Sequence, residues 1–82
     1  MRARTWFDPR VESVRAEMVA GVLSLEVAVG DVVETGQTLL LLESMKMEIP
    51  VVPEGPGTVV RVAVAPGDVV QEGDLLVVLD AR

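Results

Sequence analysis

An internal repeat constrains this chain more than any other feature of its sequence. A shift of 37 positions aligns residues 30–33 with residues 67–70, both reading Gly-Asp-Val-Val, and also aligns the apolar runs 39–42 and 76–79. Each half contains about four short strand-like segments, too few to bury an apolar face without the other half. We therefore expect an all-β fold, a flattened barrel-sandwich of two four-stranded sheets related by pseudo-twofold symmetry.

Alternation of apolar with more polar residues predicts the individual strands, as is typical of strands that are half buried. The alternation is strongest at equivalent places in the two halves, and no segment shows a helical period. The side chains that we expect to face the core are Val14, Ala16, Leu23, Leu25, Val27, Val60, Val62 and Val64.

Glycines mark the turns between these strands. Gly30 and Gly36 in the first half, with their equivalents Gly67 and Gly73 in the second, interrupt the apolar segments. We expect positive φ at each of them, because glycine adopts that conformation without steric cost. Asp31 and Asp68, which follow Gly30 and Gly67, are assigned to turn structure.

Residues 1–10 differ from the rest of the chain in having no periodicity. They combine arginines with Trp6 and Phe7, and Pro9 stands near their end. We predict a flexible N-terminal lead over residues 1–10 and a folded domain over residues 11–82. The alternative is that Trp6 and Phe7 pack on the sandwich or contact a partner.

The composition excludes several classes of function. The chain has no His and no Cys, which removes the ordinary zinc ligands, thiol nucleophiles and imidazole bases, so we expect no metal site. Its net charge of −6 argues against nucleic acid, whose binding depends on clustered Lys and Arg. No apolar run approaches the length of a membrane-spanning helix or a signal peptide, and we expect a soluble cytoplasmic protein.

The segment with most chemical interest is Glu43-Ser44-Met45-Lys46-Met47-Glu48, which contains the only lysine of the chain. Apolar residues lead into it and out of it, so we expect a tight β-hairpin. With Met45 and Lys46 as the two central residues of a type I′ turn, both need positive φ, where Asn-Gly is the usual choice. The left-handed conformation costs a non-glycine residue about 1–2 kcal/mol. Such departures from local preference are expected at functional sites.

Two further expectations concern this hairpin. Glu43 is equivalent by the repeat to Asp80, so the hairpin is the symmetry mate of the chain ends, and Lys46 should lie at the opposite end of the domain from them. Because side chains alternate along a strand, at least one of Met45 and Met47 must face solvent. Exposed methionine suits a surface that more than one partner contacts.

The segment Ser44-Met45-Lys46-Met47 resembles the biotin-attachment motif of biotinyl domains, usually Ala-Met-Lys-Met, and the chain is similar to the biotin carboxyl carrier family. The Gly-Asp-x-Val turns also match, and the resemblance covers residues 11–80, most closely to small stand-alone biotinylated proteins of actinobacteria. Ser44 replaces the commoner Ala, a small-for-small change. The chain also has no counterpart of the thumb-like insertion found in some bacterial carriers.

The resemblance implies a non-catalytic carrier with covalent biotin on Lys46. An exposed lysine is mostly protonated at neutral pH, so a biotin ligase has to deprotonate and position it. The implied partners are this ligase, a biotin carboxylase that uses ATP and bicarbonate, and a carboxyltransferase that acts on an acceptor such as an acyl-CoA, as in the acyl-CoA carboxylases of fatty acid biosynthesis. Glu43 and Glu48 are either solvated hairpin ends or contacts for basic residues of the ligase.

Two alternatives to a biotin carrier stay open at this point. A lipoyl carrier would share the fold, although lipoyl domains usually have Asp-Lys-Ala at the turn rather than methionine on both sides of the lysine. An unmodified structural or interaction module would share it as well.

Overall fold

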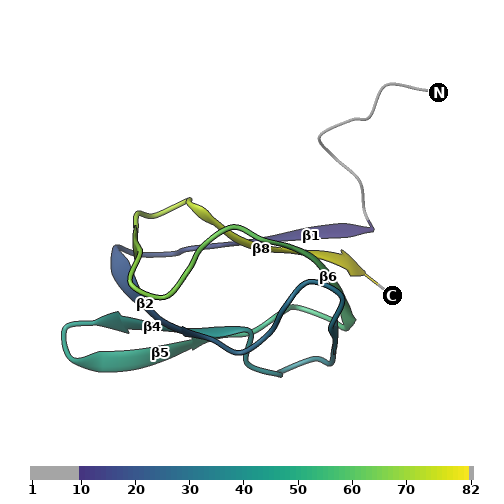
Figure 1. Cartoon of the computed structure of the whole chain (residues 1–82), viewed down its shortest axis with the longest axis horizontal. Helices are drawn as coiled ribbons and strands as arrows, with labels where there is room; N and C mark the ends of the chain where they lie inside the picture. Colours follow the sequence, from purple (N-terminus) through teal and green to yellow (C-terminus); the bar gives the residue numbers. More distant parts are fainter. Residues whose placement is uncertain (1–9, 82) are drawn as a thin grey trace.

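The computed structural model describes residues 10–81, which form two four-stranded antiparallel sheets packed face to face (Figure 1). This confirms the predicted all-β sandwich. The predicted lead over residues 1–10, including Trp6 and Phe7, lies outside the described residues apart from Arg10. The strands are β1 (Val11–Arg15), β2 (Ala20–Leu25), β3 (Val32–Val33), β4 (Leu40–Ser44), β5 (Met47–Val51), β6 (Gly57–Val62), β7 (Val69–Val70) and β8 (Leu75–Ala81).

The two sheets are related by the sequence repeat, but neither sheet corresponds to one half of the chain. Sheet A has the strand order β1-β8-β6-β3, and sheet B has the order β5-β4-β2-β7. Exchanging each strand for its repeat equivalent, β1 for β5 and β4 for β8, converts one sheet into the other. Each sheet therefore takes two strands from each half, so neither half contains a complete sheet.

Backbone hydrogen bonds from the glycine turns join the halves. Gly30 N–H donates to the carbonyl of Val59, and Val59 N–H donates to the carbonyl of Asp31, each at 2.8 Å. The equivalent pair of bonds joins Gly67 and Asp68 to Val22, again at 2.8 Å. The four turn glycines have the predicted positive φ. The carboxylates of Asp31 and Asp68 accept hydrogen bonds from backbone N–H groups within their own turns, as expected for turn residues.

A β-bulge in each half changes which residues are buried, so the predicted alternation is wrong at these two places. In the pairing of β2 with β4 the register shifts between Val22 and Ser24, so Leu23 is the additional residue, 41% exposed. The equivalent shift in β6 leaves Val60 48% exposed. A bulge reverses which face of the sheet the following residues occupy. The prediction that Leu23 and Val60 face the core is therefore wrong, and their neighbours Val22 and Val59 are buried instead.

The remaining core predictions hold. Val14, Ala16 and Val27 are buried, and Leu25, Val62 and Val64 pack against the core at its margin. Branched aliphatic side chains supply the centre of the sandwich, and no aromatic ring belongs to the buried set within residues 10–81. The side chains that are fully buried are Leu39, Leu40, Leu76, Leu79, Val33, Val59 and Val77.

Gly57 is a point where the two central strands of sheet A approach too closely for any side chain. A Cβ atom there would lie 2.8 Å from the carbonyl oxygen of Asp80, a backbone atom that cannot rotate away. We expect Gly57→Ala to lower the free energy of unfolding by about 1–3 kcal/mol, as other overpacked sites do. Gly21→Ala is the matched control, because its Cβ would lie 4.0 Å from the nearest such atom, the carbonyl oxygen of Asp68. Urea denaturation of both variants measures the effect, and equal stabilities would contradict it.

Candidate functional site

The hairpin between β4 and β5 has the predicted two-residue turn. Ser44 pairs with Met47 as the last pair of the ladder, which leaves Met45 and Lys46 as the central residues. Their φ angles are 53° and 66°, and they are the non-glycine residues with positive φ within residues 10–81. This confirms the expected type I′ geometry, in which the twist of the turn matches the twist of the two strands.

The turn is built from residues that do not favour it. Met45→Asn should relieve part of the left-handed strain, because Asn is preferred at the first central position of a type I′ turn. We expect a gain of about 1 kcal/mol in the free energy of unfolding, equivalent to about 4–8 °C in Tm for a domain of this size. Thermal denaturation measures it. A lower Tm would mean that the Met45 side chain stabilises the hairpin through a contact that the open turn does not suggest.

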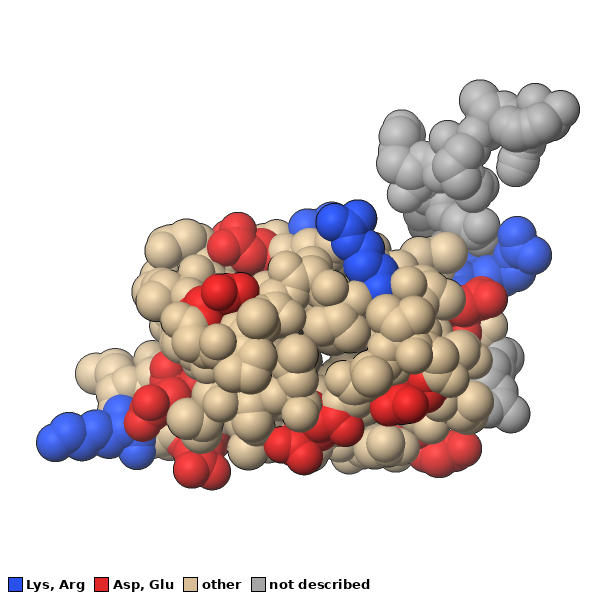
Figure 2. Space-filling view, in the orientation of Figure 1, with Lys and Arg blue, Asp and Glu red and all other residues tan. Residues whose placement is uncertain are grey.

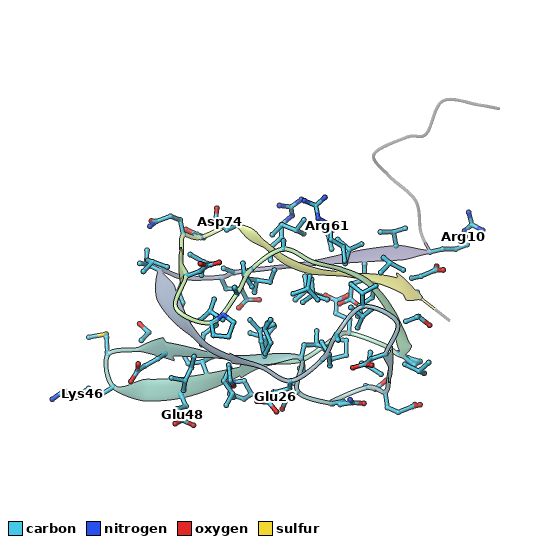
Figure 3. All side chains as sticks on the ribbon, viewed as in Figure 1. Arg10, Glu26, Lys46, Glu48, Arg61 and Asp74 are labelled. Carbon is cyan, nitrogen blue, oxygen red and sulfur yellow. The ribbon has the colours of Figure 1, made fainter. Side chains whose placement is uncertain are left out.

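Both methionines of the turn face solvent. Met45 is 92% exposed and Met47 is 64% exposed. This confirms the prediction that at least one of them faces solvent. Lys46 is also exposed, and its side chain extends away from the body of the domain (Figure 3). Together these three side chains form an apolar and cationic tip.

Met47→Leu is expected to leave the fold intact. The side chain is mostly exposed, and surface changes of this kind usually cost within about 0.5 kcal/mol. Any effect should fall on the proteins that contact the tip. A Tm lowered by many degrees would mean that Met47 packs in the core and that the hairpin register is wrong.

Acidic side chains follow directly below the tip. Glu43 and Glu48 are exposed and lie opposite one another across the two strands, an arrangement of like charges that destabilises a sheet slightly. In the same orientation as Figure 3, Figure 2 shows acidic groups beside the projecting lysine. Ser44 is half buried and completes the hairpin end. The structure thus brings all six residues of the segment together at one end of the domain.

Sequence reasoning missed how this surface continues across sheet B. Gly21 of β2 lies opposite Glu43, and Val69 of β7 lies opposite Gly21, so a row runs from Glu48 to Val69 across four strands. Val69 is 69% exposed and adds an apolar group to this row. Hydrophobic periodicity specifies which face of a strand is buried but not which strands are neighbours, so it gave no signal for this contact.

The tip lies at the far end of the domain from the chain ends that the structure describes. Figure 3 places Lys46 and Arg10 at opposite ends of the long axis. Ala81 N–H donates to the carbonyl of Arg10 at 2.6 Å, so the two described ends lie together. This confirms the inference from the repeat. A tether attached at this end leaves the lysine free to reach outward.

Within residues 10–81 no group of three or more His, Cys, Asp or Glu side chains is placed to hold a metal ion. In the same range no helix is long and apolar enough to cross a membrane.

The fold and the hairpin define a class of protein, a small β-sandwich that displays a single lysine on a strained two-residue turn. A model of the biotin/lipoyl family, described as "Biotin-requiring enzyme", matches residues 12–79. The chain therefore belongs to the biotin/lipoyl family, as the motif predicted.

Curated relatives are similar over much of their length. The biotinylated protein TB7.3 homolog of Mycobacterium leprae is 54% identical over 52 residues, which span 63% of this chain and 73% of that protein. The biotin/lipoyl attachment protein of Bacillus subtilis is 43% identical over 50 residues, which span 61% of this chain and 68% of that protein.

Two solved structures that match this fold belong to much longer chains. A single-chain, multi-domain long-chain acyl-CoA carboxylase matches with a TM-score of 0.85 and 30% identity, covering 96% of this chain and 8% of that one. The urea carboxylase of Kluyveromyces lactis matches with a TM-score of 0.81 and 30% identity, covering 96% of this chain and 7% of that one. The chain therefore corresponds to a small part of each enzyme.

Proposed function

We propose that this chain is a biotin carboxyl carrier, biotinylated on Lys46 by a biotin ligase. The observation that carries the proposal is the display of the only lysine of the chain at the tip of a strained turn, between two exposed methionines. The relatives named as biotinylated proteins support the choice of biotin. The carrier unit is residues 11–82, and it is not itself an enzyme.

The hairpin residues fit an amide-linked group. The Lys46 amine is exposed and unobstructed, so a ligase can bring it to an activated carboxyl group, and Met45 and Met47 offer apolar surface on either side. We assign recognition by the ligase and the carboxylase components to Glu43, Ser44, Met45, Met47 and Glu48. Glu43 and Glu48 lie where basic residues of a partner would meet them.

Bound biotin supplies a group that accepts a carboxyl from a biotin carboxylase and releases it at a carboxyltransferase. The chain contributes position, because a partner that holds the domain at its Arg10 end would leave the tip free to visit two sites at high effective concentration. We propose an acyl-CoA as the acceptor, and a cytoplasmic location, where ATP is available. One structural relative is named for acyl-CoA and the other for urea, which supports a carrier that leaves the choice of acceptor to the carboxyltransferase.

The test uses the biotinylated chain, the biotin carboxylase of the native host, ATP and radiolabelled bicarbonate. We expect acid-labile label on the protein, and none on chain that was never exposed to biotin ligase. Transfer of that label to an acyl-CoA after addition of the host carboxyltransferase would support the acceptor. A biotinylated chain that gains no label with any host biotin carboxylase would overturn the carboxyl-carrier function.

A lipoyl carrier is the second candidate. The name of the Bacillus subtilis relative includes both groups, and the fold serves both. The methionines on both sides of Lys46 favour biotin. Co-expression with a biotin ligase in one culture and a lipoate ligase in another separates the two, since we expect modification only in the first.

A further inference from the structure

The sandwich is open along one side, between the edge strand β1 of sheet A and the edge strand β5 of sheet B. A groove of about 590 Å³ follows this opening, a volume within the usual range of binding sites. Its apolar lining includes Val14, Leu42, Ile49 and Val51, while Met18, 40% exposed, stands at its rim. Val14 and Leu42 belong to the buried core, so the accessible apolar surface of the groove comes from the half-buried Ile49 and Val51 and from Met18. It lies along the side of the domain rather than at the hairpin tip.

Among the strands within residues 10–81, only β8 pairs with β1, so the other edge of β1 faces this groove without a partner strand. The carbonyl of Arg10 bonds to Ala81 of β8, and the pairing of β1 with β8 is regular as far as Val14. Because backbone groups alternate in direction along a strand, those of Val11 and Ser13 point away from β8. An edge strand of this kind is a template for another extended segment.

The β5 edge cannot serve in the same way. The two-residue turn makes Ser44 and Met47 a hydrogen-bonded pair, so by alternation the backbone of Pro50 faces the open side. Proline has no N–H to donate, which is why it is confined to positions such as this one. A segment entering the groove would therefore pair with β1 and place only side chains against β5.

The charged side chains around the groove indicate which charge an occupant would carry. Glu12, Glu17 and Glu54 line the groove, and Glu12 Oε2 accepts a hydrogen bond from Glu54 N–H at 2.9 Å. Arg15 is the one cation of the lining, and its guanidinium donates to the carbonyl of Gly73 at 3.0 Å, away from these carboxylates.

We propose that the groove and the β1 edge are a docking site for an extended segment of a partner protein. The segment adds to sheet A beside β1, places alternate apolar side chains against the half-buried Ile49 and Val51, and carries Lys or Arg that meet Glu17 and Glu54. This is strand addition, in which the backbone gives affinity and the alternate side chains give specificity. The site lies along the side of the domain, so occupation leaves Lys46 accessible, and the proposal does not depend on which group Lys46 carries.

The probe is a short capped peptide of alternating valine and lysine, titrated into the isotope-labelled full chain and followed by amide chemical shifts. We expect the largest shifts at Val11, Ser13 and Ile49, with slowed amide exchange at Ser13. The double variant Glu17→Lys/Glu54→Lys should bind it about fivefold more weakly or worse, since exposed ion pairs contribute modestly. A peptide of alternating valine and glutamate should instead bind the double variant more tightly than the wild type. A peptide with N-methyl groups on its pairing edge should bind more weakly than the parent peptide.

Three results would overturn the proposal. The first is an absence of shifts in the groove at millimolar peptide, and the second is binding that charge reversal or N-methylation does not change. The third is a groove already filled by this chain, detected as a dimer that the Glu17→Lys/Glu54→Lys variant alters or as peptide binding that appears only after residues 1–9 are removed. Unchanged Tm of the charge-reversal variant confirms that its effect lies in binding.

Discussion

Lys46→Arg should abolish biotin incorporation completely while leaving the fold unchanged. Arginine retains the positive charge and most of the length of lysine, but its guanidinium does not form the amide and stays protonated. Because the chain has no second lysine, no other side-chain amine can replace it. Co-expression with a biotin ligase and detection with streptavidin measure the loss. The Tm should stay within the small range of surface substitutions.

A second variant separates the geometry of the turn from the mere presence of a lysine. Arg61 is exposed on β6, beside the bulge at Val60, and does not have positive φ. Adding Arg61→Lys to Lys46→Arg supplies an accessible amine without the hairpin. We expect no streptavidin signal from this double variant. Signal from Lys46→Arg itself, or from the double variant, would mean that the hairpin is not what the ligase recognises.

Truncation of a central leucine should have the largest effect on stability. Leu39 and Leu76 are equivalent by the repeat, and both are fully buried between the sheets. Leu76→Ala should lower the free energy of unfolding by about 2–5 kcal/mol, as other buried Leu→Ala changes do. That is a large part of the stability of a small domain. The fold also predicts a similar cost, within about 1 kcal/mol, for Leu39→Ala, because the two environments are symmetry mates.

Urea denaturation of both leucine variants tests this symmetry, with Val69→Ala as the control. Val69 is 69% exposed, and its truncation should cost no more than about 0.5 kcal/mol. A Leu76→Ala domain as stable as the wild type, or a large difference between the two leucines, would contradict the pseudo-twofold core.

The repeat and the glycine turns made much of this fold predictable. The repeat predicted two related sheets, the glycines predicted four positive-φ turns, and the short spacing between apolar runs predicted a type I′ hairpin despite its unsuitable residues. These features depend on local residue preferences or on the repeat, so they can be predicted from a single sequence. The position of Lys46 far from Arg10 followed from the repeat alone.

Other features depended on contacts that periodicity does not encode. The bulges at Leu23 and Val60 reverse which face of the sheet the following side chains occupy. Both bulges lie in segments whose apolar and polar residues alternate regularly, so the residue pattern did not indicate them. The exchange of strands between the halves, with Gly30 bonded to Val59, depends on which strands become neighbours. The residue pattern within a strand does not determine its neighbours. The groove beside β1 is likewise a product of which strands lie at the edges.

The measurement that tests the central claim most directly is the mass of the protein purified from its native host, followed by peptide mapping. A single biotinyl group on the peptide that contains Lys46 is the predicted result. Addition of a lipoyl group at Lys46, or a chain that is entirely unmodified under conditions in which the host's other biotin proteins are labelled, would contradict the assignment of this domain as a biotin carrier.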